Sequence, residues 1–203
     1  MQQNIKKARI AAWLATVLTF GWLASFAQAG TFSGQAVGLR ASAVGVSLAA
    51  SDTGALPSSG GSLSTSVASV SVAGIASADL LSSSTSGSGS SSQSQSTLSD
   101  VNLLNGLITA TVVKSNSSAS CSTGQASTGG NAQLLGLTVA GQSILSSNPN
   151  LSISLPGGIS VIVNQQTSSS GGTSGSMTVN ALHVTGPSID IVVASAHSDI
   201  TCP

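Results

Sequence analysis

The fold class is decided by the stretch Leu151-Ser152-Ile153-Ser154-Leu155-Pro156-Gly157-Gly158-Ile159-Ser160-Val161-Ile162-Val163. Aliphatic residues alternate with serine before the Pro-Gly-Gly triplet and resume after it. Alternation of period two places one face of a β-strand inward and the other outward. Glycine supplies the positive φ angles that tight hairpin turns require. The stretch therefore predicts two antiparallel strands joined by a turn at residues 156–158.

The same alternation occurs upstream, at Val44–Leu48 and at Val70–Val72. No stretch after Gly30 combines a sustained period of 3.6 residues with helix caps. Alanine is common, but it is interleaved with Ser, Gly and β-branched residues that disfavour a helix. We therefore expect an all-β chain.

A strand–bend–strand pattern repeats along the chain. Two copies end in a cysteine, and a third copy lacks one. The three copies span residues 101–121, 179–202 and 70–86. Because the copies are not in tandem, a regular solenoid is disfavoured. The sequence predicts an antiparallel β-sandwich, with a β-solenoid as the alternative.

The two cysteines, Cys121 and Cys202, stand at equivalent ends of two copies of this repeat. Equivalent ends of paired or facing strands lie close in space, which is the condition for a disulfide. In an exported chain one pair of cysteines predicts a disulfide. For a loop of this length the chain-entropy model gives a stabilisation of roughly 4.5 kcal/mol.

Residues 1–29 have the pattern of a secretory signal peptide. Three basic residues fall within the first ten positions, the apolar run Ile10–Phe26 follows, and Ala27-Gln28-Ala29 precedes Gly30. A basic region, an apolar region and small residues at a cleavage site define such a peptide. The alternative, an uncleaved anchor, is disfavoured because the run is short for a bilayer core of about 30 Å. We predict cleavage between Ala29 and Gly30.

The remaining chain, residues 30–203, has the length of one domain. Phe32 is its one aromatic residue, so a core must be built from Val, Leu, Ile and Ala. Arg40 and Lys114 stand against five aspartates, which gives a net charge of −3. This charge argues against binding nucleic acid or an anionic membrane surface. We also expect no membrane span once the signal peptide is removed.

Two segments of the domain are almost wholly Ser, Gly, Gln and Thr: residues 82–99 and 167–176. Such runs offer little apolar surface to offset the entropy of ordering. We therefore predict that both are loops between strands.

The candidate chemistry is sparse. His183, His197 and Asp199 lie in one terminal region and could supply three ligands to a zinc ion. A Ser/His/Asp triad is also conceivable, but serine is so abundant that the pattern carries little information, and the Gly-x-Ser-x-Gly elbow is absent. We expect histidines on strands that face solvent or hydroxyl groups. The sequence therefore predicts no catalytic site, no enzyme activity and no cofactor.

Seven short motifs stand in an order that resembles a known family. They are Gly38-Leu39-Arg40-Ala41-Ser42, Asp52-Thr53-Gly54-Ala55-Leu56-Pro57, Ile108-Thr109-Ala110, Ser118-Ala119-Ser120-Cys121, Leu155-Pro156-Gly157-Gly158 with Asn164-Gln165, Val179-Asn180-Ala181-Leu182-His183, and Val193-Ala194-Ser195-Ala196-His197-Ser198-Asp199. Together they resemble the bacterial choice-of-anchor P family. The resemblance implies an exported protein of unassigned biochemical function with a variable C-terminal surface anchor. This sequence ends at Cys202-Pro203 without such a tail.

We therefore expect a secreted or cell-surface structural or interaction protein, with an unidentified partner in the cell envelope or outside the cell. Three alternatives stand beside it. A glycan or surface-polymer binding module ranks lower, because sugar sites usually use aromatic faces and only Phe32 is present. An assembly subunit could pair through an exposed edge strand. A hydrolase or metalloenzyme would use His183, His197 and Asp199.

Overall fold

The chain folds into β-strands joined by short connections. The computed structural model describes residues 30–43 and 45–203, and this part has no helix, hence none able to cross a membrane. The predicted signal peptide, residues 1–29 with Ala29 at its end, lies outside the described residues. The strands are β1 (Thr31–Ala43), β2 (Val46–Asp52), β3 (Gly61–Val72), β4 (Ala76–Ser88), β5 (Ser91–Leu103), β6 (Ile108–Ser122), β7 (Gln125–Leu135), β8 (Thr138–Val139), β9 (Gln142–Ser143), β10 (Leu151–Leu155), β11 (Ile159–Gly171), β12 (Ser174–Gly186) and β13 (Ile189–Thr201).

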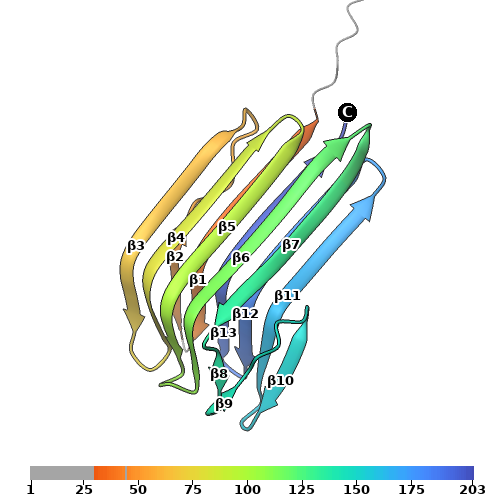
Figure 1. Cartoon of the computed structure of the whole chain (residues 1–203). Coiled ribbons are helices and arrows are strands. Elements are labelled where there is room, and N and C mark those ends of the chain that lie inside the picture. Colours follow the sequence, from red (N-terminus) through yellow and green to blue (C-terminus); the bar gives the residue numbers. More distant parts are fainter. Residues whose placement is uncertain (1–29, 44) are drawn as a thin grey trace, which may run out of the picture.

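These strands form two antiparallel sheets that pack face to face (Figure 1). The first sheet has the order β10-β11-β12-β13-β1-β2. The second has the order β3-β4-β5-β6, and β6 then pairs with the short β8–β9 hairpin at its start and with β7 along the rest of its length. Most neighbours in a sheet are consecutive in sequence, because tight turns return the chain alongside itself. The predicted antiparallel sandwich is confirmed, and the β-solenoid alternative is wrong.

The hairpin predicted from residues 151–163 is present as β10 and β11. Leu151 lies opposite Val163, and Leu155 lies opposite Ile159. Gly157 in the turn has a φ of 83°, a conformation that residues with a Cβ rarely adopt. The alternation of aliphatic residues and serine therefore gives the correct strands and register.

The three strand–bend–strand copies are hairpins. Residues 101–121 belong to the β5–β6 hairpin, residues 179–202 to the β12–β13 hairpin, and residues 70–86 to the β3–β4 hairpin. The two copies that end in cysteine lie in different sheets. The sandwich is therefore built from similar hairpins that face each other.

One half of the sandwich has an aliphatic core. Leu39 of β1, Leu182 of β12 and Ile191 of β13 face Leu98 of β5 and Val113 of β6, and all five are fully buried. Burial of each such side chain contributes about 1.5–3 kcal/mol to the free energy of folding. These contacts hold the two sheets together where the Val, Leu and Ile residues are concentrated.

A truncation pair tests this core. Leu98→Ala should lower the free energy of unfolding by about 2–5 kcal/mol, because it leaves a cavity between the sheets. Leu80→Ala, in the neighbouring strand but 70% exposed, should change it by no more than about 0.5 kcal/mol. Urea unfolding followed by circular dichroism measures both. Equal losses would show that the sheets do not meet at Leu98.

The predicted loops at 82–99 and 167–176 are wrong, because both segments are strand hairpins. Residues 82–99 comprise the end of β4, a two-residue turn and most of β5. Residues 167–176 comprise the end of β11, a two-residue turn and the start of β12. Pairing of β4 with β5 is regular from Ser82 opposite Thr97 to Ser88 opposite Ser91. The serine-rich segments therefore continue the two sheets into the second half of the sandwich.

Buried hydroxyl groups explain why these serine-rich strands are ordered. Their inward side chains form hydrogen bonds from one sheet to the other: Ser51 Oγ with Ser83 Oγ (3.1 Å), Ser94 Oγ with the carbonyl oxygen of His197 (2.6 Å), and Ser117 Oγ with Ser198 Oγ (2.9 Å). A buried hydroxyl is tolerated when it has such a partner. Ser115 is the exception, since its buried Oγ has no hydrogen-bond partner within the described residues. In this half, hydrogen bonds between the sheets thus help to hold the sheets together, as aliphatic contacts do in the other half.

In this serine-rich half of the sandwich the side chains are small, so the two sheets lie close together. Gly34 of β1 faces Thr85 of β4 and two serines of β5. A Cβ built on Gly34 would collide with Thr85 Oγ1 and would lie 2.9 Å from Ser92 Oγ and 3.0 Å from Ser94 Oγ. Real Cβ atoms do not approach so closely, so a larger residue at position 34 would push the sheets apart.

Two glycine substitutions separate this packing effect from a loss of backbone freedom. Gly34→Ala should cost about 1–3 kcal/mol, because overpacking forces the two sheets to shift. Gly89→Ala, in the turn after β4, should be nearly neutral, since nothing lies within 4 Å of the added Cβ and its φ is not positive. Thermal unfolding compares them. A neutral Gly34→Ala would contradict the close approach.

Candidate functional site

The predicted His/Asp residues lie on the outward face of the first sheet, but they do not form one cluster. His197 of β13 lies opposite Thr178 on β12, whereas His183 is five residues further along β12 and lies opposite Val192. His197 Nε2 is 3.2 Å from Asp199 Oδ2, and His183 Nε2 is 3.1 Å from Asp190 Oδ1. The three residues proposed as metal ligands are therefore divided between two separate His/Asp pairs.

Each histidine also forms a hydrogen bond through its other ring nitrogen, Nδ1. His197 Nδ1 lies 2.8 Å from Thr178 Oγ1, and His183 Nδ1 lies 2.9 Å from Gln165 Oε1. Both pairs are partly open to solvent, with Asp190 62% exposed at its side chain. Among the described residues no group of three or more His, Cys, Asp or Glu side chains is arranged to hold a metal ion. Three of these contacts join neighbouring strands across the sheet surface, whereas the contact of His197 with Asp199 lies within β13.

Cys121 and Cys202 form a disulfide between the two sheets. Cys121 lies in β6 of the second sheet, and Cys202 follows β13 of the first. Their Cα atoms are 5.6 Å apart, within the range of native disulfides. The bond encloses a sequence separation of 81 residues. It joins the ends of the two strands in the half of the sandwich with fewer aliphatic contacts.

Removal of this bond should destabilise the protein. The double variant Cys121→Ser/Cys202→Ser should lose about 2–4 kcal/mol of unfolding free energy, because the unfolded chain regains the entropy of an open loop. Comparison of urea midpoints with and without reductant provides the measurement, and reductant should leave the variant unchanged. Identical midpoints for oxidised and reduced wild type would contradict a structural role for the bond.

A second and larger surface feature is the outward face of the second sheet, here called the polar face. Strand pairing aligns its side chains in four rows across β3 to β7. The rows are Ser66, Ser82, Thr97, Lys114 and Gln133; Ser64, Ser84, Gln95, Asn116 and Asn131; Ser62, Ser86, Gln93, Ser118 and Gly129; and Ser88, Ser91, Ser120 and Ser127. Neighbours within a row are about 4.8 Å apart, and rows are about 6.8 Å apart.

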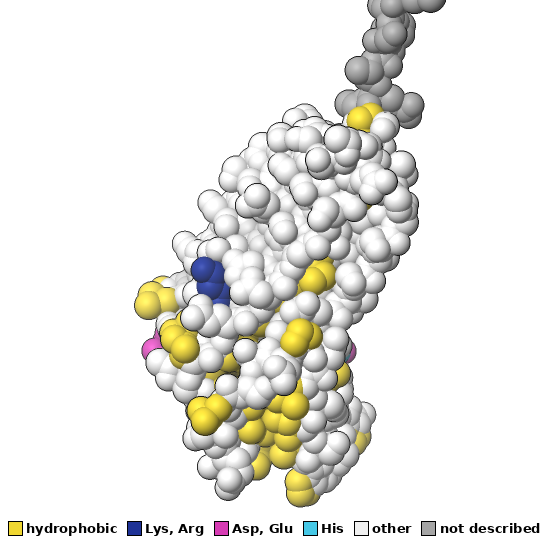
Figure 2. All heavy atoms as spheres, turned by 45° about the vertical axis from the view of Figure 1, so that its right-hand side comes forward, with side chains coloured by type: hydrophobic (Ala, Val, Ile, Leu, Met, Phe, Trp, Pro, Cys, Tyr) yellow, Lys and Arg dark blue, Asp and Glu magenta, His cyan; other side chains and the backbone are white. Residues whose placement is uncertain are grey.

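Lys114 is the one ionisable member of these rows, all of which lie in the described part of the chain. The rest carry hydroxyl or carboxamide groups, apart from Gly129. Figure 2 shows the same division on the surface, where hydrophobic side chains gather at the lower end of the molecule and uncharged polar groups cover the upper end. The polar face therefore offers many uncharged hydrogen-bonding groups and a single charge, that of Lys114.

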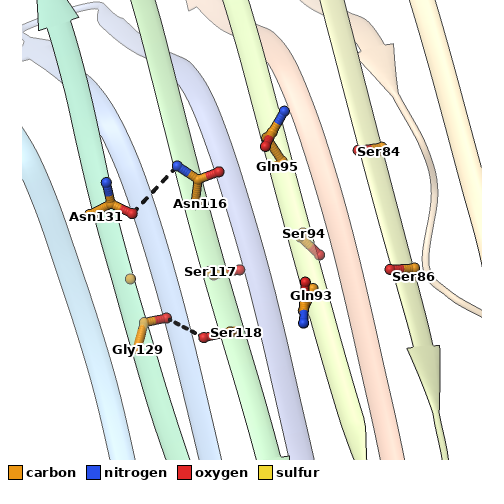
Figure 3. A pocket seen from close by; sticks show the side chains of 11 residues that line it. Ser84, Ser86, Gln93, Ser94, Gln95, Asn116, Ser117, Ser118, Gly129 and Asn131 are labelled. Atoms are coloured by element: carbon orange, nitrogen blue, oxygen red, sulfur yellow. Dashed lines mark hydrogen bonds between the residues drawn. The ribbon is translucent and has the colours of Figure 1, made fainter.

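The polar face contains a shallow hollow of about 390 Å³ (Figure 3). Small residues on β6 and β7, Ser118 and Gly129, lie beside the longer carboxamides of Gln93 and Asn116. Ser118 Oγ donates to the carbonyl oxygen of Gly129 at 3.3 Å, and Asn116 Nδ2 is 3.4 Å from Asn131 Oδ1. A carboxamide offers both a donor and an acceptor, so the hollow can bind ligands that carry hydroxyl or amide groups.

Gln93 and Gln95 of β5 project from the face as exposed side chains. Sequence reasoning missed them because it assigned residues 82–99 to a loop. The signal was present as a strict spacing of two, with Gln93 and Gln95 on one face and Ser92, Ser94 and Ser96 on the other. The inward residues are polar too, so the alternation has no hydrophobic contrast.

No protein-family model, no curated protein and no solved structure matches this chain.

Proposed function

We propose that this chain is an exported, non-enzymatic interaction protein of the cell surface or extracellular medium, which binds an uncharged polymer, such as a glycan, through the polar face. The single observation that carries the proposal is the arrangement of hydroxyl and carboxamide groups in four rows, with Lys114 as the sole ionisable member among them. A surface of this kind attracts neither nucleic acid nor a charged partner.

Two further observations support export. The N-terminal pattern of residues 1–29 is that of a signal peptide. The Cys121–Cys202 disulfide is of a kind that persists in oxidising compartments. Membership of the choice-of-anchor P family, proposed on the resemblance, would agree with both.

A polymer suits the polar face better than a small ligand. The hollow is shallow, and the aromatic side chain that sugar sites usually supply is missing from the rows. Each neutral hydrogen bond contributes only about 0.5–1.5 kcal/mol. Useful affinity therefore requires many such bonds along one chain, and the rows repeat at a spacing that can supply them.

Retention on immobilised polysaccharides tests the proposal. Wild-type protein should be retarded on affinity gels that contain neutral glycans. The double variant Gln93→Ala/Gln95→Ala should weaken the apparent affinity by about tenfold, since two carboxamides at the hollow are lost. Raised salt should leave the retardation unchanged, because the rows are almost uncharged.

The matched control is Gln142→Ala, an exposed glutamine on β9 outside the four rows. It should bind as the wild type does. Failure of every neutral glycan to retard the wild type, or equal losses in the double variant and the control, would contradict binding through the polar face.

A further inference from the structure

Carboxamide side chains are concentrated at the hollow of the polar face. Five members of the four rows are Asn or Gln, and four of these line the hollow. The four are Gln93, Gln95, Asn116 and Asn131. The fifth, Gln133, lies in the row of Lys114, outside the hollow. The other members of the rows carry hydroxyl groups, apart from Lys114 and Gly129, so the hollow is where the amide groups of the polar face converge.

The amide groups around the hollow have atoms left to bind a ligand. Among the residues drawn in Figure 3, Asn116 Nδ2 donates to Asn131 Oδ1 at 3.4 Å, and no hydrogen bond reaches the side-chain amide of Gln93 or Gln95. Each carboxamide has an acceptor oxygen and two donor hydrogens. The single bond between Asn116 and Asn131 therefore leaves the oxygen of the first and the nitrogen of the second. The rim of the hollow offers both donors and acceptors.

The floor of the hollow differs from its rim. Ser118 and Gly129 are register partners on β6 and β7, and Ser118 Oγ donates to the carbonyl oxygen of Gly129 at 3.3 Å. This bond uses the hydroxyl hydrogen of Ser118. A Cβ built on Gly129 would have a single neighbour within 4 Å, Ser118 Oγ at 3.4 Å, which is an ordinary van der Waals contact. The floor therefore has room for a methyl group beside the amides of the rim.

We propose that the hollow binds the acetamido group of an N-acetylated amino sugar in an uncharged glycan, an inference that rests on glycan binding by the polar face. A trans secondary amide directs its N–H and its C=O to opposite sides. The carboxamides come from β5 on one side of the hollow and from β6 and β7 on the other (Figure 3). They can therefore bond both edges of the acetamido group, while its methyl group lies over Gly129.

The lining of the hollow favours the acetylated sugar over a charged one. None of the residues that line it, all in the described part of the chain, carries an ionisable side chain. A free amino sugar or an acidic sugar would give up part of its hydration there without meeting an opposite charge. The acetamido group is neutral and has one donor and one acceptor, so it matches the carboxamides without this cost.

A second hollow gives the neighbouring sugar of the same polymer a place. It has a volume of about 250 Å³ and adjoins the first, since Ser86 and Gln93 line both. Its other lining residues are serine and glycine, from the ends of β3 and β4 and the start of β5. Gln93 is its one carboxamide. We therefore expect the acetamido group to be recognised in the first hollow and sugar hydroxyl groups in the second.

Calorimetric titration of the purified protein with two matched glycans tests the proposal. The probes are the hexamer of β-1,4-linked N-acetylglucosamine and the hexamer of β-1,4-linked glucose, which differ in having an acetamido or a hydroxyl group at C2. The N-acetylated hexamer should bind about tenfold more tightly, because it adds two neutral hydrogen bonds at the rim.

Two leucine substitutions on β7 locate the effect. Gly129→Leu should abolish the preference for the N-acetylated hexamer, because the leucine side chain fills the floor. Its backbone tolerates a side chain, since its φ is not positive and the added Cβ makes an ordinary contact. Ser127→Leu is the matched control: it is exposed, lies two residues away on the same strand and lines neither hollow. It should keep the tenfold preference, and circular dichroism should show both variants folded.

The outcomes separate this inference from glycan binding itself. Equal affinity of the wild type for the two hexamers, or equal loss of preference in Gly129→Leu and Ser127→Leu, would overturn acetamido recognition while glycan binding stands. Binding of neither hexamer would overturn it together with glycan binding. Chitin beads should retain the protein more strongly than purified peptidoglycan, in which every second amino sugar carries a charged peptide branch. The reverse order would overturn the assignment to an uncharged polymer.

Discussion

The close approach of two sheets of small side chains is the constraint on which the rest of the structure depends. Phe32 is the one aromatic residue among the described residues, and Ser, Gly and Ala fill much of the interior. Small residues bury little apolar area each, so the sheets must come near enough for hydroxyl groups to reach across. Gly34 meets Thr85, and Ser94 reaches the backbone of β13. The disulfide at Cys121 adds a covalent link in this same half.

This packing also shapes the outer surface. Where the interior uses serine, the strands can carry serine, glutamine and asparagine on the outside without losing their register, because backbone pairing and cross-sheet hydrogen bonds define the inward face. The polar face and the polar interior are thus formed by the outward and inward side chains of the same serine-rich strands. The result is a regular surface on which Lys114 is the one charged member of the four rows, and the function proposed for the chain is argued from that surface.

The sequence predicts the fold well where side chains differ in polarity. The alternation at residues 151–163 gives the β10–β11 hairpin, and the repeat places Cys121 and Cys202 at strand ends that meet. Prediction failed at residues 82–99, because Ser83 and Ser94 point inward while Ser82 and Gln93 point outward. Composition does not distinguish an inward serine with a partner across the sheets from a serine in a loop. That partner belongs to a strand far away in the sequence.

Local breaks in the alternation are a second source of error. Val193 and Ala194 are consecutive yet both buried, and Ala194 has a φ of 51°. Asp79 and Leu80 are consecutive yet both exposed, and Leu80 has a φ of 47°. A pattern of period two shifts by one residue at such points. The register of the strands also could not be read from the sequence at the histidines. His183 and His197 lie in paired strands, but they are five residues apart in register and therefore do not meet.

Amide hydrogen exchange across residues 82–99 tests the central claim most directly. If buried hydroxyl groups order these strands, their paired amides exchange with protection close to that of the β12–β13 hairpin. Exchange at the rate of an unstructured peptide throughout this segment would contradict the account, because the polar face and the hydroxyl-lined interior would then both be absent.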